Sequence, residues 1–481
     1  MIDFRPVGYV VGLLVAVLGA TMLVPMALDL YLGNAIWINM LESAIATVAT
    51  GLFVCLSCAN GAREKLTLQQ IFLLTTGVWL LLPVFGALPL YLGLQHLSYV
   101  DAYFEAMSGL TTTGATVLSG LDQMPQGILL WRGMLQWFGG VGIVVVAMVF
   151  LPEVGVGGMQ IFKSEGFETD GKILPRATQI AAQISVIYVV LTAACALTYA
   201  ALGMNNFDAL VHAMTTLSTG GFANYDSSFG RFDGELHYAC SLFMISAALP
   251  FVRYIQFAAG ATGRLFRDKQ VQVFLWINVV GTMSITLWLW SRSGVSEISF
   301  REALFNSVSI LTGTGYASAD YTLWGTFPPM AIFFLGLIGG CAGSTACSVK
   351  VFRYQLLFAS LRVRIRRIHS PNAVMVARYE GKPVSDELLS SVMVFFAAFV
   401  LSIGGLSVAL GMTGLDQITA LSGAATAIAN IGPGLGPEIG PAGNFAGLND
   451  MAKWLLSAGM LVGRLELVSV IVIMTPHFWR T

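Results

Sequence analysis

The sequence has few charged residues. They make up 11% of its 481 positions, while hydrophobic residues make up 56% and the mean hydropathy is +0.75. Soluble domains carry roughly 25% charged residues, so this composition excludes a soluble protein and predicts a polytopic membrane protein surrounded by membrane lipid. The formal net charge is −1 and no basic tail occurs, so nothing indicates nucleic acid as a partner.

Clustered metal ligands and nucleotide-binding motifs are also lacking. The six cysteines lie in apolar surroundings, and the one CxxC pair, Cys55 and Cys58, has no second pair nearby. We therefore favour core packing over zinc or redox chemistry for them. The five histidines are scattered and form no catalytic or metal set, and no Walker or GxGxxG phosphate cradle occurs. These absences predict a protein that is not an enzyme and has no organic cofactor, with a membrane-embedded enzyme as the alternative of another class.

Apolar windows of about twenty residues, the length that crosses the hydrocarbon, predict ten membrane spans. They lie near 8–32, 37–59, 70–94, 128–151, 178–202, 236–258, 270–291, 328–358, 388–410 and 453–475. Lys and Arg orient them, because short cytoplasmic loops carry an excess of positive charge. The stretches 253–269 and 362–382 are rich in Arg and Lys, whereas 66–131 and 383–452 contain neither. The basic stretches are therefore expected in the cytoplasm and the other two outside.

Four similar short segments recur along the chain, roughly 100 residues apart, which leaves room for two membrane helices around a re-entrant loop. Each ends in a glycine that follows small, mostly hydroxyl-bearing residues, and a leucine or isoleucine lies four residues before that glycine. The segments are Thr111, Thr112, Thr113 and Gly114; Ser218, Thr219, Gly220 and Gly221; Thr312, Gly313, Thr314 and Gly315; and Ala429, Asn430, Ile431 and Gly432. All four enter from the outer side according to the charge pattern.

The predicted fold class is an all-α polytopic membrane protein with four helix–pore loop–helix repeats around one pore plus two N-terminal transmembrane helices. Irregular backbone is too costly in contact with lipid, so the four loops must line water or one another. We place the N-terminal pair of helices at 1–62. The four repeats are placed at 63–160, 161–263, 264–368 and 369–481.

The loops have the chemistry of a cation pathway. Asp101, Asp208 and Glu302 each lie thirteen residues before a loop glycine, and at the start of a short helix they would leave its negative C-terminal end pointing at the loop. Glycine permits backbone torsions that turn successive carbonyls inward, and rings of carbonyl oxygens can replace the water shell of potassium. No Lys or Arg occurs in the loops. The sequence therefore predicts a filter for a cation.

Four acids follow the loops, and two interpretations of them stay open. They are Asp122, Asp226, Asp320 and Glu438. They could raise the local cation concentration at the outer mouth, or they could be ordinary solvated loop residues.

The run from Thr111 to Thr116, together with the run from Asn430 to Gly434, resembles the Trk/Ktr/HKT superfamily of cation transporters, and its bacterial potassium-uptake branch in particular. The resemblance covers essentially the whole chain. It implies a potassium-translocating subunit with K⁺ as the transported ion. The filter then consists of Thr111, Thr112, Thr113, Gly114, Ser218, Thr219, Gly220, Gly221, Thr312, Gly313, Thr314, Gly315, Asn430, Ile431 and Gly432.

The resemblance also has consequences for selectivity and partners. Gly114 stands where some sodium-selective plant relatives carry serine, which favours potassium. The fourth repeat departs from the other three because Ile431 lacks a side-chain oxygen and Pro433 follows the glycine. The resemblance further implies a homodimer in the bacterial inner membrane and a cytosolic nucleotide-binding regulatory partner of the TrkA type. The coupling ion stays open, and the alternative within transport is a sodium-coupled or weakly selective monovalent cation carrier.

A gate is predicted below the filter. Each interior glycine costs a helix about 1 kcal/mol relative to alanine, and the span after the third loop contains a cluster of them, so it should unwind mid-membrane. Close packing through small residues is the alternative. A charged residue in mid-span normally faces a polar interior, so Arg464 is expected to face the pore and to form a barrier with the carbonyls of about 340–348. The gate residues are Gly339, Gly340, Gly343, Ser344, Thr345 and Arg464.

Three charged residues near the gate have plainer expected roles. We expect Lys350 and Arg353 to end the interrupted helix at the cytoplasmic interface, with their side chains snorkelling to water. Glu466 lies two positions after Arg464 and so points elsewhere on the helix. A structural pair with another helix and a functional role are both open for it.

Overall fold

The computed structural model describes residues 2–61, 66–149, 177–261, 263–370, 372 and 375–480. The predicted repeat boundaries at 62/63 and 160/161 lie outside the described residues. Within the described part, helices account for nearly all regular structure, and the one strand pair is the short antiparallel hairpin of β1 (Arg378–Tyr379) and β2 (Lys382–Pro383).

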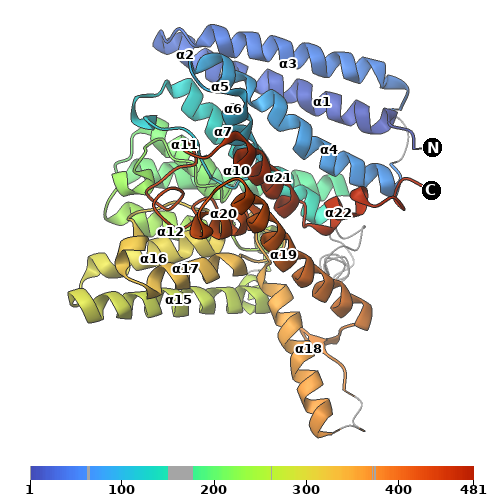
Figure 1. The fold of residues 1–481 in the computed structure, drawn as a ribbon, viewed down its shortest axis with the longest axis vertical. Coiled ribbons are helices and arrows are strands. Elements are labelled where there is room, and N and C mark those ends of the chain that lie inside the picture. Colours follow the sequence, from blue (N-terminus) through green and yellow to red (C-terminus); the bar gives the residue numbers. More distant parts are fainter. Residues whose placement is uncertain are drawn as a thin grey trace.

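Two N-terminal helices form a separate layer on one side of the molecule (Figure 1). The first is α1 (Arg5–Thr21) continued by α2 (Leu23–Leu32), and the second is α3 (Trp37–Ser57). Glycines allow these helices to pack backbone against backbone: a Cβ on Gly12 would lie 2.7 Å from the backbone nitrogen of Cys55, and one on Gly19 would lie 2.8 Å from that of Val48. Small residues at such crossings are the usual way for membrane helices to associate.

Four units of similar construction follow, each with an outer helix, a short helix and a second membrane helix. The first unit contains α4 (Leu68–Gly86) with α5 (Leu88–Gly93), α6 (Tyr99–Leu110) and α7 (Gln126–Val149). The second contains α10 (Ala177–Ala201), α11 (Asn206–Leu217), α12 (Glu235–Ala247) with α13 (Phe251–Ala258), and then α14 (Gly263–Arg267). The third contains α15 (Lys269–Ser293), α16 (Glu297–Thr312), α17 (Phe327–Ile338) and α18 (Val351–His369). The fourth contains α19 (Asp386–Met412), α20 (Gln417–Ala429), α21 (Asp450–Arg464) and α22 (Val468–Met474). The predicted fold class is confirmed.

Three of the ten predicted spans are not continuous helices, and only the break after the third loop was expected. Among the described residues, 7 helices are long and apolar enough to cross a membrane alone, and α12 with α13 makes an eighth span that bends by 93°. The predicted span 328–358 is interrupted between α17 and α18, and the predicted span 453–475 between α21 and α22. Hydropathy averages over a window, so it does not register interruptions within an apolar stretch.

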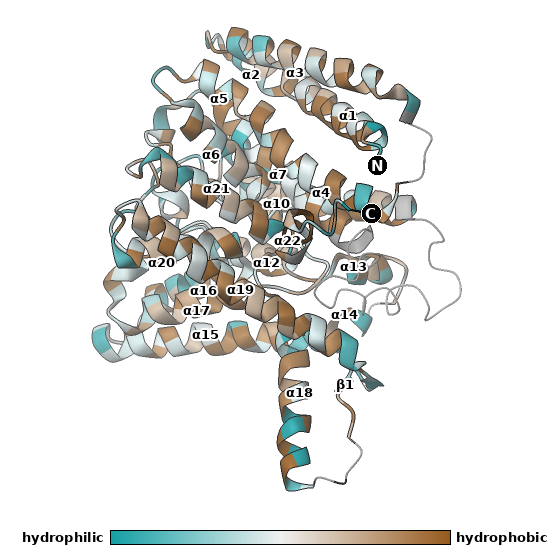
Figure 2. Cartoon of the chain, turned by 45° about the vertical axis from the view of Figure 1, so that its right-hand side comes forward, coloured by the Kyte–Doolittle hydropathy of each residue, from teal (hydrophilic) through white to brown (hydrophobic). Residues whose placement is uncertain are grey.

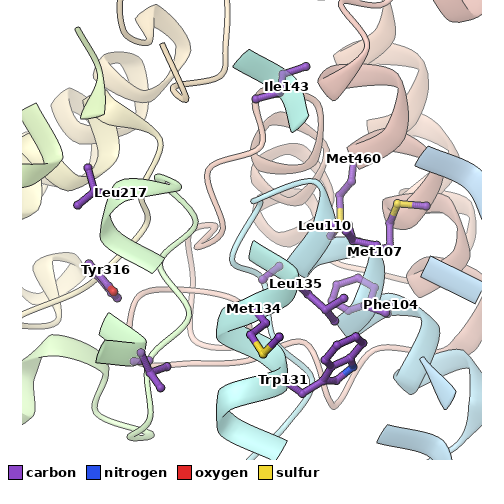
Figure 3. Packing of buried hydrophobic residues seen from close by; sticks show 14 of the residues in the cluster. Phe104, Met107, Leu110, Trp131, Met134, Leu135, Ile143, Leu217, Tyr316 and Met460 are labelled. Carbon is purple, nitrogen blue, oxygen red and sulfur yellow. The ribbon is translucent and has the colours of Figure 1, made fainter. Parts of the chain in front are cut away.

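The short helices α6, α11, α16 and α20 are mostly buried, whereas the long helices other than α7 are mostly not. Figure 2 shows hydrophobic residues along the outer helices and hydrophilic residues mainly at their ends and on α18, which projects from the body. Around α6 and α7 the core is dense: Trp131 and Leu135 of α7 lie beside Phe104 of α6 (Figure 3), and all three are fully buried. This packing holds the first loop in a fixed position.

Candidate functional site

The four predicted loops begin where the four short helices end. The helices α6, α11, α16 and α20 stop at Leu110, Leu217, Thr312 and Ala429. Asp101 and Asp208 lie in the first turns of α6 and α11, as expected. Glu302 does not begin its helix, because α16 starts earlier, at Glu297, and this expectation is wrong. The C-terminal ends of all four helices reach the loops, so their negative dipole ends face the same centre.

All four loops share the same unusual backbone. The loop glycines have left-handed φ values of +84°, +74°, +84° and +106° for Gly114, Gly221, Gly315 and Gly432. The residues two positions earlier are left-handed as well: Thr112, Thr219, Gly313 and Asn430 have φ values of +52°, +51°, +75° and +51°. Such torsions cost about 1–3 kcal/mol at a residue other than glycine and persist only where the surroundings fix them. The register seen in the sequence therefore corresponds to one repeated conformation.

The four loops close into a ring. Each loop glycine packs against the carbonyl oxygen of the residue that precedes the glycine of the next loop. A Cβ on Gly114 would overlap the oxygen of Gly220, one on Gly221 that of Thr314, and one on Gly315 that of Ile431. The fourth contact returns to the first loop, where a Cβ on Gly432 would lie 2.7 Å from the oxygen of Thr113. Only loops arranged around one axis can make this cyclic set of contacts.

A cavity opens on the ring. It has a volume of about 210 Å³ and is lined by all four loop glycines together with residues that follow the first, second and fourth loops, so it has room for several water molecules. Of the four acids considered for the mouth, Asp226 lines the cavity and Asp122, Asp320 and Glu438 do not. Asp226 also accepts backbone hydrogen bonds from Gly120 at 2.8 Å and Leu121 at 3.1 Å. Its carboxylate therefore connects the segment after the second loop to the segment after the first loop.

Hydroxyl groups of the first and third loops form hydrogen bonds with other groups of the protein. Thr111 donates to the carbonyl of Met107 at 2.7 Å, and its hydroxyl oxygen lies 2.8 Å from that of Thr113. The third loop repeats this pair between Thr312 and Thr314 at 2.8 Å. These hydroxyls therefore join neighbouring residues within the first loop and within the third loop.

The fourth loop reaches the same conformation by different contacts. Asn430 donates from Nδ2 to the hydroxyl of Thr113 and to the carbonyl of Met460, each at 2.9 Å. The Ile431 side chain is buried and packs against α17, where a Cβ on Gly336 would lie 2.7 Å from it. A side-chain amide and an apolar contact thus replace the hydroxyl pair of the first and third loops.

A buried ion pair behind the first two loops was missed by the sequence analysis. Arg132 Nε donates to Glu105 Oε1 at 2.8 Å, with the two side chains 1% and 0% exposed. Glu105 also accepts from the backbone of Val117 at 2.9 Å, and Arg132 donates to the carbonyl of Ala223 at 3.0 Å. Arg132 lies inside a predicted span, and a charge there is itself a signal of a polar interior.

The predicted unwinding after the third loop is present. Residues 339–350 separate α17 from α18 and lie against the bend between α12 and α13. Cys341 donates its backbone N–H to Ala248 at 3.0 Å, and Phe251 donates to Gly343 at 2.9 Å. The backbone of this intramembrane loop is therefore partnered by the backbone freed at the neighbouring bend, which satisfies the requirement that membrane-buried polar groups be paired.

Arg464 lies against the intramembrane loop, as expected. It is 3% exposed and donates from Nη2 to the carbonyl of Gly139 at 3.1 Å and from Nη1 to that of Thr345 at 3.5 Å. Nη1 also contacts the sulfur of Cys347. The same sulfur lies 3.9 Å from the hydroxyl of Thr112 in the first loop. The intramembrane loop thus lies between the ring and the arginine.

The snorkelling expected for Lys350 and Arg353 is wrong. Both are buried, and Lys350 immediately precedes α18. The Lys350 ammonium lies 3.0 Å from Glu466, and the Arg353 guanidinium pairs with the other oxygen of the same carboxylate. Glu466 therefore forms a structural pair, because buried charges are tolerated only with partners. This cluster joins the start of α18 to the break after α21.

Known proteins are similar to this chain in sequence and in arrangement. The sequence model of TrkH, described as a cation transport protein, matches residues 39–480. The Trk system potassium uptake protein TrkI of Halomonas elongata is 43% identical over 466 residues, 95% of each chain. The Trk system potassium uptake protein TrkH of Escherichia coli K12 is 35% identical over 99% of each chain. The crystal structure of the potassium transporter TrkH from Vibrio parahaemolyticus superposes over 100% of both chains with a TM-score of 0.91 and 33% identity.

Proposed function

The chain belongs to the TrkH family of cation transport proteins, and from this premise we propose that it is the potassium-translocating subunit of a bacterial Trk-type potassium uptake system in the inner membrane. The multi-pass helical fold and the names of its relatives support this proposal. The single observation that carries it is the closed ring of four loops. A ring of this kind provides carbonyl oxygens in place of the hydration shell of one cation.

In the proposed filter, K⁺ passes through the ring formed by the four loops. The oxygens of Thr113, Gly220, Thr314 and Ile431 are the carbonyls that follow one another around the axis. The other filter residues hold these four carbonyls in place. The negative ends of four helix dipoles add to the attraction for a cation at the centre.

The proposed gate consists of the intramembrane loop and Arg464. The loop lies between the ring and the arginine, and Gly339, Gly340, Gly343, Ser344 and Thr345 are all buried. A cation that leaves the filter meets a positive charge in surroundings of low dielectric constant, where like charges repel strongly. Conduction therefore requires the loop and the Arg464 side chain to move apart.

Two partners belong to the proposal. The first is a second copy of the chain, and the second is a cytosolic nucleotide-binding regulator of the TrkA type, both expected from the family resemblance. The end of α18 projects from the body (Figure 1) and exposes Arg362, Arg364, Arg366 and Arg367. A basic surface of this kind suits an acidic partner surface or anionic lipid.

The experiment that tests the function is uptake by a bacterial host that lacks its own potassium transporters. Expression of the chain should restore growth at low potassium, and uptake of ⁸⁶Rb⁺ should be inhibited by excess K⁺ much more than by equal Na⁺. Equal inhibition by the two ions would favour the sodium-coupled or weakly selective alternative. No uptake of either ion, with the protein present in the membrane, would contradict the proposal.

A further inference from the structure

Gln136 holds the second loop from behind. This residue of α7 is 0% exposed. Its Nε2 donates to the carbonyl oxygen of Gly220 at 2.7 Å, and its Oε1 accepts from the backbone N–H of Phe222 at 3.0 Å. The two bonds lie on either side of Gly221, so one amide spans the filter glycine of this loop.

The other three loops have a side chain where the second loop has Gly220. The equivalent residues are Thr113, Thr314 and Ile431, and both threonines pair with a hydroxyl two positions earlier. The second loop has no such pair, and Ser218 instead donates to the carbonyl of Thr215 at 3.2 Å.

Gln136 occupies the space that a side chain at 220 would need. A Cβ built on Gly220 would overlap the amide carbon of Gln136. The backbone of Gly220 is not left-handed, so its torsions do not require glycine. The absence of a side chain at 220 is therefore explained by the glutamine that reaches in from α7.

We propose that Gln136 is a positioning residue that replaces the missing side chain of the second loop and fixes the direction of the Gly220 carbonyl, and thereby contributes to the preference for K⁺ over Na⁺. This inference rests on the proposed function. A carbonyl oxygen has two lone pairs, so it can accept from the amide and still face an ion.

The amide bond affects ion preference in two ways. It limits the movement of the carbonyl toward the axis, and the donor N–H lowers the negative potential that the oxygen presents to an ion. Without the amide, the oxygen becomes a stronger and more mobile ligand. Ligand number and field strength are among the factors that separate K⁺ from Na⁺, and a stronger, closer ligand favours the smaller ion.

The first test replaces Gln136 with methionine, which has a similar length and makes neither hydrogen bond. The Gln136→Met variant should still take up ⁸⁶Rb⁺, but Na⁺ should compete roughly fivefold better than in the parent, the ratio that corresponds to one hydrogen bond of about 1 kcal/mol. The matched control is Trp137→Phe. It removes a bond of 3.1 Å from the next residue of α7 to Thr192 on α10, away from the loops, and should leave the ratio unchanged.

The second test adds a side chain at residue 220 and shortens the one at residue 136. Gly220→Thr alone should abolish uptake because the threonine collides with Gln136. Combining it with Gln136→Ala makes room for the threonine and allows a hydroxyl pair with Ser218 like those of the first and third loops. The double variant should recover uptake and the K⁺ preference. Such recovery would not occur if residue 220 and Gln136 acted separately.

The outcomes separate this inference from the function itself. A parent protein without potassium-inhibited ⁸⁶Rb⁺ uptake would contradict the proposed function. A selective parent together with an unchanged ratio in Gln136→Met, or a double variant no better than Gly220→Thr, would overturn the role of Gln136 alone. If Gln136→Met does not reach the membrane, the double variant is the test: recovered uptake supports the role of Gln136, and no recovery overturns it.

Discussion

The four repeats are alike where their loops meet and differ immediately below. At the ring, each loop has two left-handed residues and the same contact between a glycine and the next carbonyl. Below the ring, α7 continues, α12 bends by 93° into α13, α17 gives way to a buried loop, and α21 ends at Arg464. Equivalent ligands around an ion require repeated geometry, whereas a barrier needs only one segment that crosses the path. In the proposed function, the repeated loops are the ligands of the ion and the one differing segment is the gate.

The largest effect should come from breaking the ring. Gly114→Ala, Gly221→Ala and Gly315→Ala each force a Cβ into a neighbouring carbonyl at a left-handed residue, so ⁸⁶Rb⁺ uptake should fall below detection. Gly120→Ala is the matched control, because Gly120 has a φ of +73° but no atom within 4 Å of the added Cβ. Gly432→Ala, with its looser contact of 2.7 Å, should keep some uptake. Equal loss in all five variants would contradict the ring contacts as the cause.

The next effect concerns stability below the ring. Glu466→Gln leaves Lys350 and Arg353 buried without their carboxylate, so the free energy of unfolding should fall by about 3–5 kcal/mol. Chemical denaturation in detergent, followed by tryptophan fluorescence, measures this change. Glu438→Gln removes an exposed carboxylate and should change stability by less than about 0.5 kcal/mol. Equal stability of the two variants would show that the buried cluster does not join α18 to the end of α21.

The third effect tests the gate. Arg464→Ala removes hydrogen bonds from a charged donor to Gly139 and Thr345, each worth about 1.5–3 kcal/mol, so cation flux in proteoliposomes should rise at least roughly tenfold. Arg464→Lys keeps the charge and should show a smaller rise. Arg464 lies 5.5 Å from the centre of the Trp79 ring. Arg292→Ala is the control, because Arg292 lies in the same way 4.5 Å from the centre of the Trp288 ring but is exposed. Flux in Arg464→Ala no higher than in the parent would reject the barrier.

The smallest effect lies at the outer mouth. Asp226 lines the cavity whereas Glu438 does not, so Asp226→Asn should raise the potassium concentration for half-maximal uptake by roughly twofold at low ionic strength. Glu438→Gln should change it less, and added salt should reduce both effects. An Asp226→Asn effect that persists at high salt would mean that the carboxylate acts by holding Gly120 and Leu121 rather than by its charge.

Repeated features were predictable from the sequence, and single contacts between distant segments were not. The four loops, their short helices and the unwinding after α17 depend on local composition, namely glycine, small residues and apolar length. The prediction for Lys350 and Arg353 was wrong because a snorkelling argument takes into account only one side chain and the bilayer. Their partner Glu466 lies more than a hundred residues away in the chain, so the argument left it out. Arg132 and Gln136 were missed for the same reason, since their partners Glu105 and Gly220 lie on other elements.

The sequence by itself determined that this protein lies in a membrane, that its loops come in four equivalent copies and that two of its helices stand apart, because hydropathy and glycine torsions act over short stretches of chain. Only the tertiary structure decided which carbonyl each loop glycine contacts, that Lys350 and Arg353 pair with Glu466, and that a glutamine replaces a side chain in one loop. Those arrangements depend on which helices meet in space, and the low dielectric constant of the interior makes each buried polar group require a particular partner there.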